Sequence, residues 1–483
     1  MNKEMLRSPE LAEPELARIV ESFRELPVSE LEVYSYFDVD GTPEAAGIRE
    51  QNKEAFLAGE IRNPHLNFPK LADTQTVAFL SDSEHAILDL MNDATRLDHD
   101  VSRVRAVEDI LRMAYLNVAM LQITAEMQDE DLTGEERQKY AELFNLANDE
   151  VYGRPDETIF FGLIQKERQR AQGILDENGS TQAAKDIAAQ FLEGTSHIDT
   201  IATVDDFEVS QEALSAIREV VEYEFADLLA LIPESGEALD VPAMVKLFEA
   251  GHQARNTGWP VRVVPGKSQL ESSQSQQTTL IGEKRKALPL DEAGGLLIHE
   301  NGIHVGRRKN GDNLGDPLLK GLGLAGYADF EEGLGVSAEE VLQGKTRESG
   351  TQYYLAIGFA RGLDDKPRDF RDTFELAWRR EALKSAKDGQ IDEAVIDKAR
   401  KQAYIQCVRI FRGTPCDIPG MVYTKDQAYL RGNRQAWGVL TEIASLPLEA
   451  RREAYRKLLA AKYDPTNENH VRLVDEALER AEA

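Results

Sequence analysis

The sequence predicts a predominantly α-helical chain with a small β-sheet, an α+β protein. Three observations support this prediction. Apolar residues recur at three- and four-residue spacing over much of the chain, strand-like segments are confined to its middle part, and 42% hydrophobic with 29% charged residues is the balance of a globular protein. At 483 residues, the chain can bury one large core or several smaller ones without disulfide bonds.

Helical periodicity is clearest in the first third and at the end of the chain. Residues 1–45 are acidic and punctuated by proline, and we expect them to form a helical N-terminal extension to an α-rich main domain of residues 46–483. An apolar stripe within 103–124 predicts a helix with one buried face; its members are Val107, Ile110, Leu111, Ala114, Val118 and Leu121. Further helices are expected over 391–411, 448–462 and 469–482.

Capping signals place two more helices. Asp240 followed by Pro242 predicts a helix start, because a proline in the first turn lacks only an N–H that would have no helical partner there. Ser337 and Glu340 have the spacing of a capping box, and Gly344 supplies a stop. We therefore expect 338–343 to be a short helix of its own.

The strand signals lie in 257–266 and 277–284, where β-branched residues stand between turn-forming residues. We expect these two segments to form one hairpin. The Ser/Gln-rich stretch 268–277 between them is then expected to be a surface loop.

Charge and cysteine content restrict the partners and the compartment. The chain has 56 Lys and Arg against 86 Asp and Glu, a net charge of −30, which repels nucleic acid and anionic membranes. No apolar run approaches the roughly 20 residues of a membrane span, and the N-terminus lacks the apolar stretch of a signal peptide. Cys407 and Cys416 are expected to be reduced thiols of a cytoplasmic protein.

The most informative motif is an HExxxH arrangement formed by His299, Glu300 and His304. In a regular α-helix, a spacing of five residues separates two side chains by about 140° around the axis, too far to share a metal ion. One inserted residue, a π-bulge, restores a common face, and Gly302 lies where a permissive backbone makes the bulge easier. The spacing therefore predicts a bulged helix.

A carboxylate that could complete a metal site follows downstream. Glu331 and Glu332 lie at the start of an expected helix, about thirty residues after the histidines. Two histidines and one glutamate are the ligands of many catalytic zinc sites, in which the fourth position stays open. The alternative is that both histidines are hydrogen-bonded core residues and the glutamates a solvated helix start.

Several segments together resemble one known family. HENGIHVGR at 299–307 is similar to the HEIGTHxxR motif of the microtubule-associated tyrosine carboxypeptidases, whose bacterial members carry a QEGLA motif, here EEGLG at 331–335. NPHLNFPKL at 63–71, RIFRGT at 409–414 and GMVYTKDQAYLRG at 420–432 extend the resemblance in the same order. It thus covers roughly residues 60 to 435. It implies a zincin-like metallopeptidase fold around the bulged HExxxH helix.

The resemblance also implies roles for individual residues. The ligands of one zinc ion per chain fall on His299, His304 and Glu332, the catalytic glutamate falls on Glu300, and Glu331 and Gly302 support the ligands. Asn301, Ile303 and Gly335 depart from the family's motifs. In chemical terms, Glu300 can act as general base on a zinc-bound water and pass its proton to the leaving amine.

Cations near these motifs suggest how a substrate is held. Residues 401–435 are locally basic in an acidic chain, and guanidinium groups bind carboxylates bidentately. A peptide or protein C-terminus is therefore the expected substrate. The candidate contacts to it are Arg307, Arg409, Arg412, Lys425 and Tyr429, and Tyr423 is a further candidate for stabilising the oxyanion.

Two alternative functions stay open. A dipeptidyl-peptidase III-like aminopeptidase also uses a six-residue histidine motif and paired glutamates. A regulatory protein could keep the zinc for structure alone, although such a site has no use for a base like Glu300. A carboxypeptidase that releases a C-terminal residue is the leading hypothesis.

Overall fold

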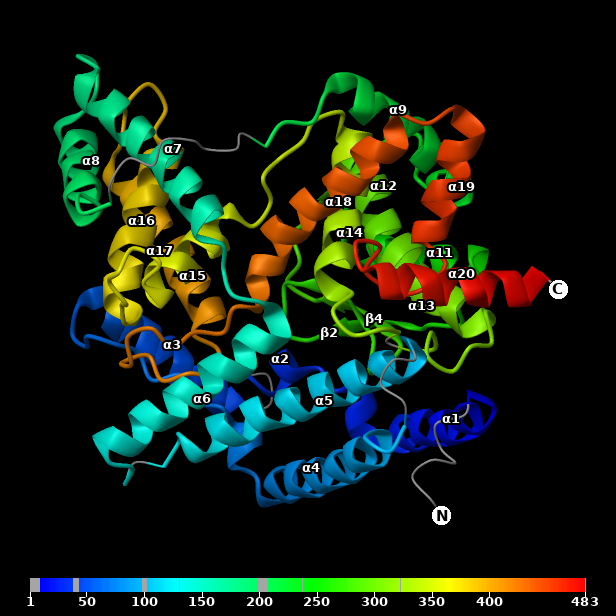
Figure 1. The fold of residues 1–483 in the computed structure, drawn as a ribbon. Helices are drawn as coiled ribbons and strands as arrows, with labels where there is room; N and C mark the ends of the chain where they lie inside the picture. The colour runs from blue at the N-terminus through cyan, green and yellow to red at the C-terminus, as the bar shows by residue number, and fades with distance from the viewer. Residues whose placement is uncertain are drawn as a thin grey trace.

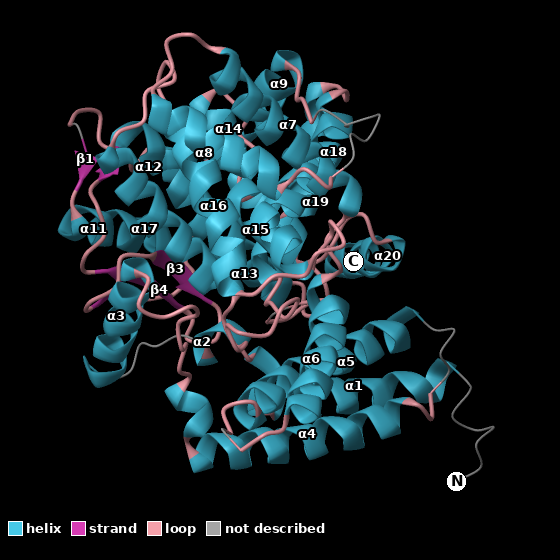
Figure 2. Cartoon of the chain, turned by 90° about the vertical axis from the view of Figure 1, so that its left-hand side faces the viewer, coloured by secondary structure: helices cyan, strands magenta, loops and turns pink. Residues whose placement is uncertain are grey.

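The computed structural model describes residues 9–37, 43–97, 102–129, 131–198, 207–236, 238–321 and 323–482. Within these residues the chain is mostly helical with two small sheets, which confirms the α+β prediction (Figures 1 and 2). Buried apolar side chains form three clusters, and α15, α16 and α17 contribute to two of them. A large cavity lies among the helices.

The N-terminal part of the chain forms one layer of helices. Both views show α1, α4, α5 and α6 along one side of the molecule. The bounds are α1 Pro9–Glu25, η2 Pro27–Glu30, α2 Val33–Tyr36, α3 Pro43–Ala58, η3 Pro69–Ala72, α4 Thr74–Ala94, α5 Ser102–Glu126 and α6 Gly134–Tyr152. The stripe predicted in 103–124 lies on α5, where Val107, Leu111 and Val118 are buried.

The residues expected to form an N-terminal extension contribute directly to this layer. Leu16, Ile19 and Phe23 of α1 are buried in the same core as α4 and α5. The boundary at residue 45 stays a prediction, but the described part of this segment is packed onto the rest of the chain.

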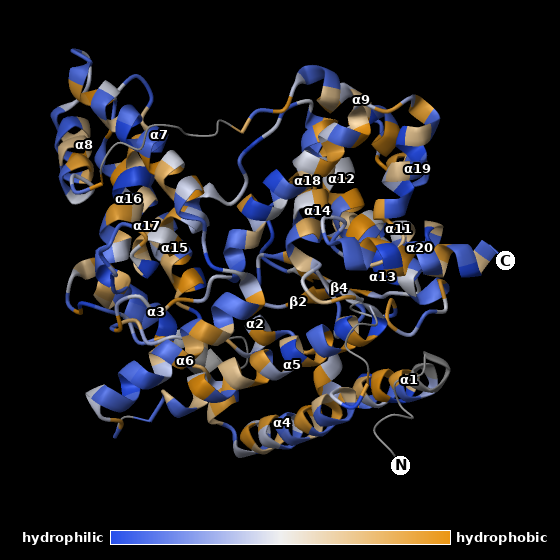
Figure 3. Cartoon of the chain, viewed as in Figure 1, coloured by the Kyte–Doolittle hydropathy of each residue, from blue (hydrophilic) through white to orange (hydrophobic). Residues whose placement is uncertain are grey.

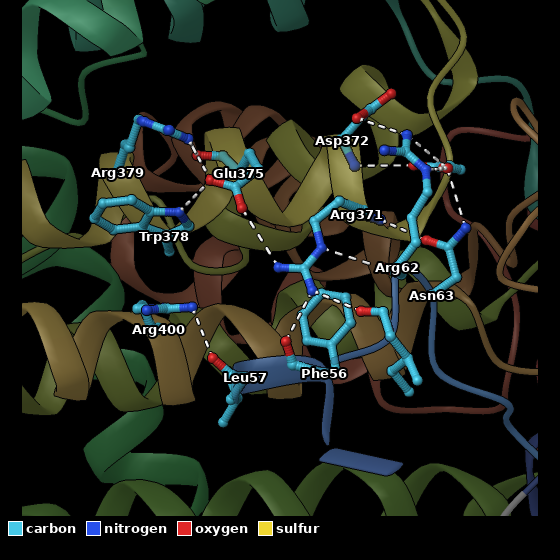
Figure 4. Close-up of polar contacts among 12 residues, drawn as sticks. Phe56, Leu57, Arg62, Asn63, Arg371, Asp372, Glu375, Trp378, Arg379 and Arg400 are labelled. Carbon is cyan, nitrogen blue, oxygen red and sulfur yellow. Dashed lines mark hydrogen bonds and ion pairs between the residues drawn. The ribbon is translucent and has the colours of Figure 1, made fainter. Parts of the chain in front are cut away.

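Five arginine contacts at the end of α3 show how this layer joins the next group of helices (Figure 4). Arg371 on α16 donates to the carbonyls of Phe56, Ile61 and Arg62, and its guanidinium carbon lies 3.6 Å from the centre of the Phe56 ring. Arg400 on α17 donates to the Leu57 carbonyl at 3.0 Å. Positive side chains here satisfy terminal carbonyls of α3 and interact favourably with the helix dipole.

The remaining helices form two groups above this layer. One group holds α7 Glu157–Asp176, α8 Gln182–Gly194, α15 Thr351–Arg361, α16 Phe370–Ser385 and α17 Glu393–Ile410. The other holds α9 Gln211–Glu224, α10 Ala226–Leu229, α11 Val241–Ala254, α12 Leu290–Leu297, η4 Ile298–Val305, α13 Gly306–Asn313, α14 Ala328–Gln343, α18 Ala428–Ala444 and α19 Leu448–Leu458. The short η5 Lys425–Gln427 precedes α18, and α20 Glu468–Glu482 packs on the N-terminal layer.

Most predicted helices are confirmed, with one correction. The helix after Asp240 is α11, and the Asp240 side chain accepts a hydrogen bond from the Ala243 N–H. The short helix expected at 338–343 is wrong, because α14 runs unbroken from Ala328 to Gln343. The Ser337 hydroxyl donates to the Leu334 carbonyl inside this helix, and buried Glu340 accepts from the Trp437 indole instead of capping a helix start.

The predicted hairpin is also wrong. β2 Val261–Val264 and β4 Thr278–Gly282 are parallel neighbours, and β3 Leu270–Ser273 pairs antiparallel with β4 inside the stretch expected to be a loop. A separate pair joins β1 Ala238–Leu239 to β5 Leu288–Pro289. Tertiary contacts decide this pairing: Leu270 packs against the core, and Glu32 accepts hydrogen bonds from the turn after β3.

Two glycines let α14 and α18 cross in direct backbone contact. A Cβ at Gly333 would lie 1.9 Å from the Gly432 carbonyl oxygen, and one at Gly432 would lie 1.8 Å from that of Asp329. Any larger residue would force the helices apart. This crossing fixes the first turns of α14, which carry Glu331 and Glu332.

Figure 3 shows apolar and polar residues mixed along the labelled helices. Across the described ranges, no helix combines the length and apolar character required to cross a membrane. Cys407 and Cys416 are both buried and free.

Candidate metal centre

The HExxxH segment forms the π-helical turn that its spacing predicts. η4 spans Ile298–Val305 and continues α12 into α13 without a break. The wider turn brings His299 and His304 to one side. That Gly302 makes the bulge easier stays a prediction; the residue also packs closely, since a Cβ there would lie 2.6 Å from the Phe225 ring. Its lack of a side chain makes room for that ring.

Three ligand atoms converge at this turn. The Nε2 atoms of His299 and His304 lie 3.1 Å apart, and His299 Nε2 lies 3.8 Å from a carboxylate oxygen of Glu332. The three ligand atoms all lie within 4.8 Å of one another. Two imidazoles and a carboxylate at this separation form a donor set that suits a divalent zinc ion.

The far side of each imidazole is held by a second carboxylate. His299 Nδ1 lies 2.6 Å from Glu339, and His304 Nδ1 lies 2.9 Å from Glu331. Since a carboxylate accepts a proton from Nδ1, each neutral ring is left with its lone pair on Nε2, pointing at the other ring. Glu331 thus orients a ligand, whereas Glu339 was missed; it lies two helical turns after Glu332 on the same helix.

The carboxylates also favour positive charge between the rings. Burial opposes a charge on His299, but its contacts with Glu332 and Glu339 raise its pKa well above the ordinary value. Burial would likewise raise the pKa of Glu332, yet the two histidines and Lys425 lower it to about 2. Glu332 is therefore held as a carboxylate, and the negative charge that favours a proton on His299 would also favour a metal cation that displaces this proton.

Arg307 lies behind the site, which corrects its expected role in substrate binding. It is fully buried and donates to the carbonyls of Ala461 and Tyr463 at 2.9 and 2.6 Å. Its third contact is Glu331, at 3.2 Å. Lys462 donates to the same carboxylate at 2.5 Å, and despite burial these positive charges help to hold the pKa of Glu331 at about 2. Arg307 is fully buried and is not among the residues that line the cavity, so it is not placed to contact a substrate.

Glu300 faces the other way, into the cavity. Its side chain is 7% exposed, and its Oε2 atom has no hydrogen-bond partner among the described residues. Asn301 and Ile303, two of the departures from the family motif, are buried on the core side instead. The turn therefore brings the two histidines and Glu300 into the cavity lining, and one oxygen of Glu300 is buried without a partner among the described residues.

The close approach of His299 to α14 explains why position 335, another departure from the family's motifs, is a glycine. A Cβ at this position would lie 2.6 Å from the His299 ring. The absence of a side chain lets the imidazole lie flat against α14.

A cavity of about 780 Å³ opens onto the metal-site residues. One wall comes from the N-terminal layer, including Val20, Phe23 and Leu111, and is largely apolar. The opposite wall holds His299, Glu300, His304 and Glu332 together with residues of β3 and of the segment before α18. The volume lies in the range of sites that enclose small ligands.

The four candidate substrate cations have different surroundings. Arg409 lines the cavity but is paired bidentately with Asp426, at 2.7 and 2.9 Å. Arg412 and Lys425 also line the cavity, and neither has an ion-pair partner in the part of the chain that the structure describes. These two, unlike Arg307 and Arg409, are available to a substrate carboxylate.

Of the two tyrosines that were candidates for substrate or oxyanion contacts, one lines the cavity and the other does not. Tyr429 lines the cavity near Glu332, whose charge raises the pKa of the phenol. Tyr423 is buried, its hydroxyl lies 2.8 Å from that of Tyr152, and it is not among the residues that line the cavity. Sequence reasoning also missed Tyr34 and Arg285, which line the cavity from segments outside the motifs.

The fold and the site together define a helical protein with a candidate metal centre on one wall of an internal cavity. Comparison of the chain with protein-family models, with curated proteins and with solved structures found no match. The resemblance to a peptidase family therefore stays a prediction from the sequence motifs.

Proposed function

We propose that this chain is a zinc-dependent metallopeptidase of the carboxypeptidase type, with the zincin-like site that its resemblance to the microtubule-associated tyrosine carboxypeptidases implies. The main support is one observation: two imidazole Nε2 atoms face one another 3.1 Å apart beside Glu332, while both Nδ1 atoms are held by carboxylates. Structural histidines in a core need no such paired arrangement. Ligands of a metal ion do.

His299, His304 and Glu332 are the residues that would hold the metal. When bound, zinc supplies Lewis-acid polarisation of a carbonyl and makes water more acidic. Glu339 and Glu331 keep the two rings in the tautomer that presents Nε2. The donor set of two nitrogens and one oxygen leaves a position open for chemistry, as catalytic zinc sites do.

Glu300 moves the proton in the proposed reaction. Glu300 lines the cavity, and in this reaction its carboxylate takes a proton from the attacking water as the new C–O bond forms. It then gives this proton to the nitrogen of the leaving amine as the C–N bond breaks. Tyr429 lies on the same wall and is the candidate donor to the oxyanion.

Lys425 and Arg412 would bind the free carboxylate at the end of the substrate. Their charges are not used by any ion pair among the described residues, and both face the cavity. A carboxylate taken out of water needs such a partner, which would restrict cleavage to the last residue of a chain. The buried free thiols favour a reducing compartment such as the cytoplasm.

The test is a cleavage profile on a peptide library prepared with free and with amidated C-termini. Wild-type protein should release the C-terminal residue from free-acid peptides and spare the amides. Glu300→Gln should lower turnover by about 10²–10⁴-fold while zinc content is retained. Glu292→Gln, an exposed acid on the neighbouring helix α12, is the matched control and should behave as wild type.

Four outcomes would contradict this assignment in different ways. Full activity of Glu300→Gln removes the proposed base. Equal cleavage of free and amidated peptides removes the carboxypeptidase assignment, and release of N-terminal dipeptides would favour the aminopeptidase alternative. Zinc without cleavage of any peptide would favour a regulatory role.

A further inference from the structure

Tyr34, in the segment expected to be a mere extension, lies beside the proposed carboxylate-binding lysine. The Lys425 ammonium lies 4.5 Å from the centre of the Tyr34 ring, which is the geometry of a cation–π contact. Both side chains line the cavity. The charge of Glu332 acts on both of them, which places the pair close to the metal ligands.

The Tyr34 ring affects the charge of Lys425 differently from the way in which carboxylates on the same wall affect the charges of two arginines. Arg409 is paired with Asp426, and Arg431 with Asp329, so their charges are largely neutralised. Lys425 makes no direct ion pair among the described residues; the charge of Glu332 acts on it without such a contact, and its ammonium lies over the face of Tyr34. An aromatic face fixes the position of an ammonium without cancelling its charge. Burial raises the pKa of the Tyr34 phenol, which keeps the ring neutral.

The segment that carries Tyr34 is fastened on both sides. Before it, Glu30 pairs with Arg308 at 2.5 Å. Glu32 accepts hydrogen bonds from the Gln274 N–H at 2.9 Å and the Ser275 hydroxyl at 2.7 Å, in the turn between β3 and β4. After it, Phe37 is fully buried. These contacts place the Tyr34 ring and hold it against Lys425.

We propose that Tyr34 is a positioning residue for Lys425, so that the N-terminal segment sets the preference for peptides with a free C-terminal carboxylate. This inference rests on the proposed function, because it assigns the carboxylate contact to Lys425. Tyr34 acts through the lysine: its ring holds the ammonium toward the cavity, ready for an anionic chain end.

The test compares three variants in the Glu300→Gln background, where binding is measured without turnover. Tyr34→Phe keeps the ring, Tyr34→Leu removes it, and Tyr36→Leu changes a tyrosine of the same short helix that does not line the cavity. The probe is a fluorescein-labelled peptide library with free carboxylates, followed by anisotropy, and the same library amidated. Melting temperature checks that each variant is folded.

Tyr34→Leu should weaken binding of the free-acid library by about 3- to 30-fold, the range of a desolvated cation–π contact. The amidated library should bind equally to all variants. Tyr34→Phe and Tyr36→Leu should stay within about twofold of the parent. In a Lys425→Met background, Tyr34→Leu should cause no further loss, because both changes remove one interaction.

The inference is overturned if Tyr34→Phe binds the free-acid library as weakly as Tyr34→Leu does, because the hydroxyl would then be the contact. It is also overturned if Tyr34→Leu weakens binding of the amidated library equally, because Tyr34 would then only shape the cavity. Additive losses with Lys425→Met overturn it as well. Failure of the proposed function looks different. If Lys425→Met weakens free-acid binding but Tyr34→Leu does not, only this inference fails; if the parent protein carries no zinc and wild type cleaves nothing, the proposed function fails.

Discussion

His299 and His304 face one another through Nε2 atoms 3.1 Å apart, although five positions separate them in the sequence. A regular helix would point these side chains in different directions. The π-helical turn of η4 removes that difference, and Glu339 and Glu331 then lock the two rings. The facing arrangement of the two imidazole rings therefore depends on both the wider turn and two carboxylates from α14.

The carboxylate behind His299 offers a first prediction. Glu339→Gln should weaken zinc binding by about 10- to 100-fold, since a ligand that loses its carboxylate partner becomes less basic and less well oriented. Competition with a chromogenic chelator measures this affinity. Glu339 also pairs with the half-exposed Arg347, so Arg347→Met is the control. An equal loss in both variants would show that the ion pair, not the histidine contact, is responsible.

The close approach of His299 to α14 gives a second prediction. Gly335→Ala should destabilise the chain by about 1–3 kcal/mol and lower zinc affinity, because its methyl group would press on the imidazole. Gly438→Ala, on an exposed face of α18 with nothing within 4 Å, should instead leave stability unchanged or raise it by up to about 1 kcal/mol. Urea unfolding compares the two. Similar effects at both positions would contradict the packing argument.

The different surroundings of two arginines give a third prediction. Arg307→Met should cost about 3–5 kcal/mol of stability, because it leaves buried acceptors and part of the Glu331 charge without a partner. Arg412→Met should leave stability near wild type and reduce the preference for free-acid peptides. Urea unfolding and the peptide library measure both. If Arg307→Met instead reduced the preference for free-acid peptides without loss of stability, Arg307 would be a substrate contact after all.

Much of the site could be predicted from the sequence because its information is local. The five-residue spacing of the histidines allows one helical solution if they share a metal, and η4 adopts it. Glu332 and Glu331 were found through a motif. Arg307 could not be placed correctly, because its partners Ala461 and Tyr463 come from a distant segment that no pattern connects to the motif.

The sheet and the N-terminal wall were mispredicted for the same kind of reason. β3 consists of one leucine followed by glutamate and two serines, and it becomes a strand only because β4 lies beside it and Glu32 holds the following turn. Tyr34 carries no motif at all. Its position against Lys425 depends on how the N-terminal layer packs over the cavity, which periodicity alone does not reveal.

Stability should also depend on pH through His252, which takes no part in the candidate metal site. This ring is 3% exposed, lies within hydrogen-bond distance of Thr257 and Thr279, and has a pKa lowered by burial from 6.5 to about 4. The unfolded chain therefore binds a proton more readily than the folded chain. Stability contributed by the neutral ring is present above about pH 6.5 and is lost as the pH falls toward 4.

Urea unfolding at pH 7 and pH 5 measures this effect. Between these values wild type should lose roughly 2 kcal/mol more than His252→Gln, which cannot titrate in this range. Equal losses in the two proteins would show that the buried ring is not the source.

Zinc content tests the central claim most directly. Purified wild-type protein, measured by atomic emission after dialysis, should carry about one zinc ion per chain. His299→Ala, His304→Ala and Glu332→Ala should each lose most of it while keeping their helical circular-dichroism spectrum, because two ligands hold zinc poorly. Wild-type protein without zinc, or full occupancy in all three variants, would contradict the account, and full occupancy in Glu332→Ala with loss in Glu331→Ala would move the third ligand to Glu331.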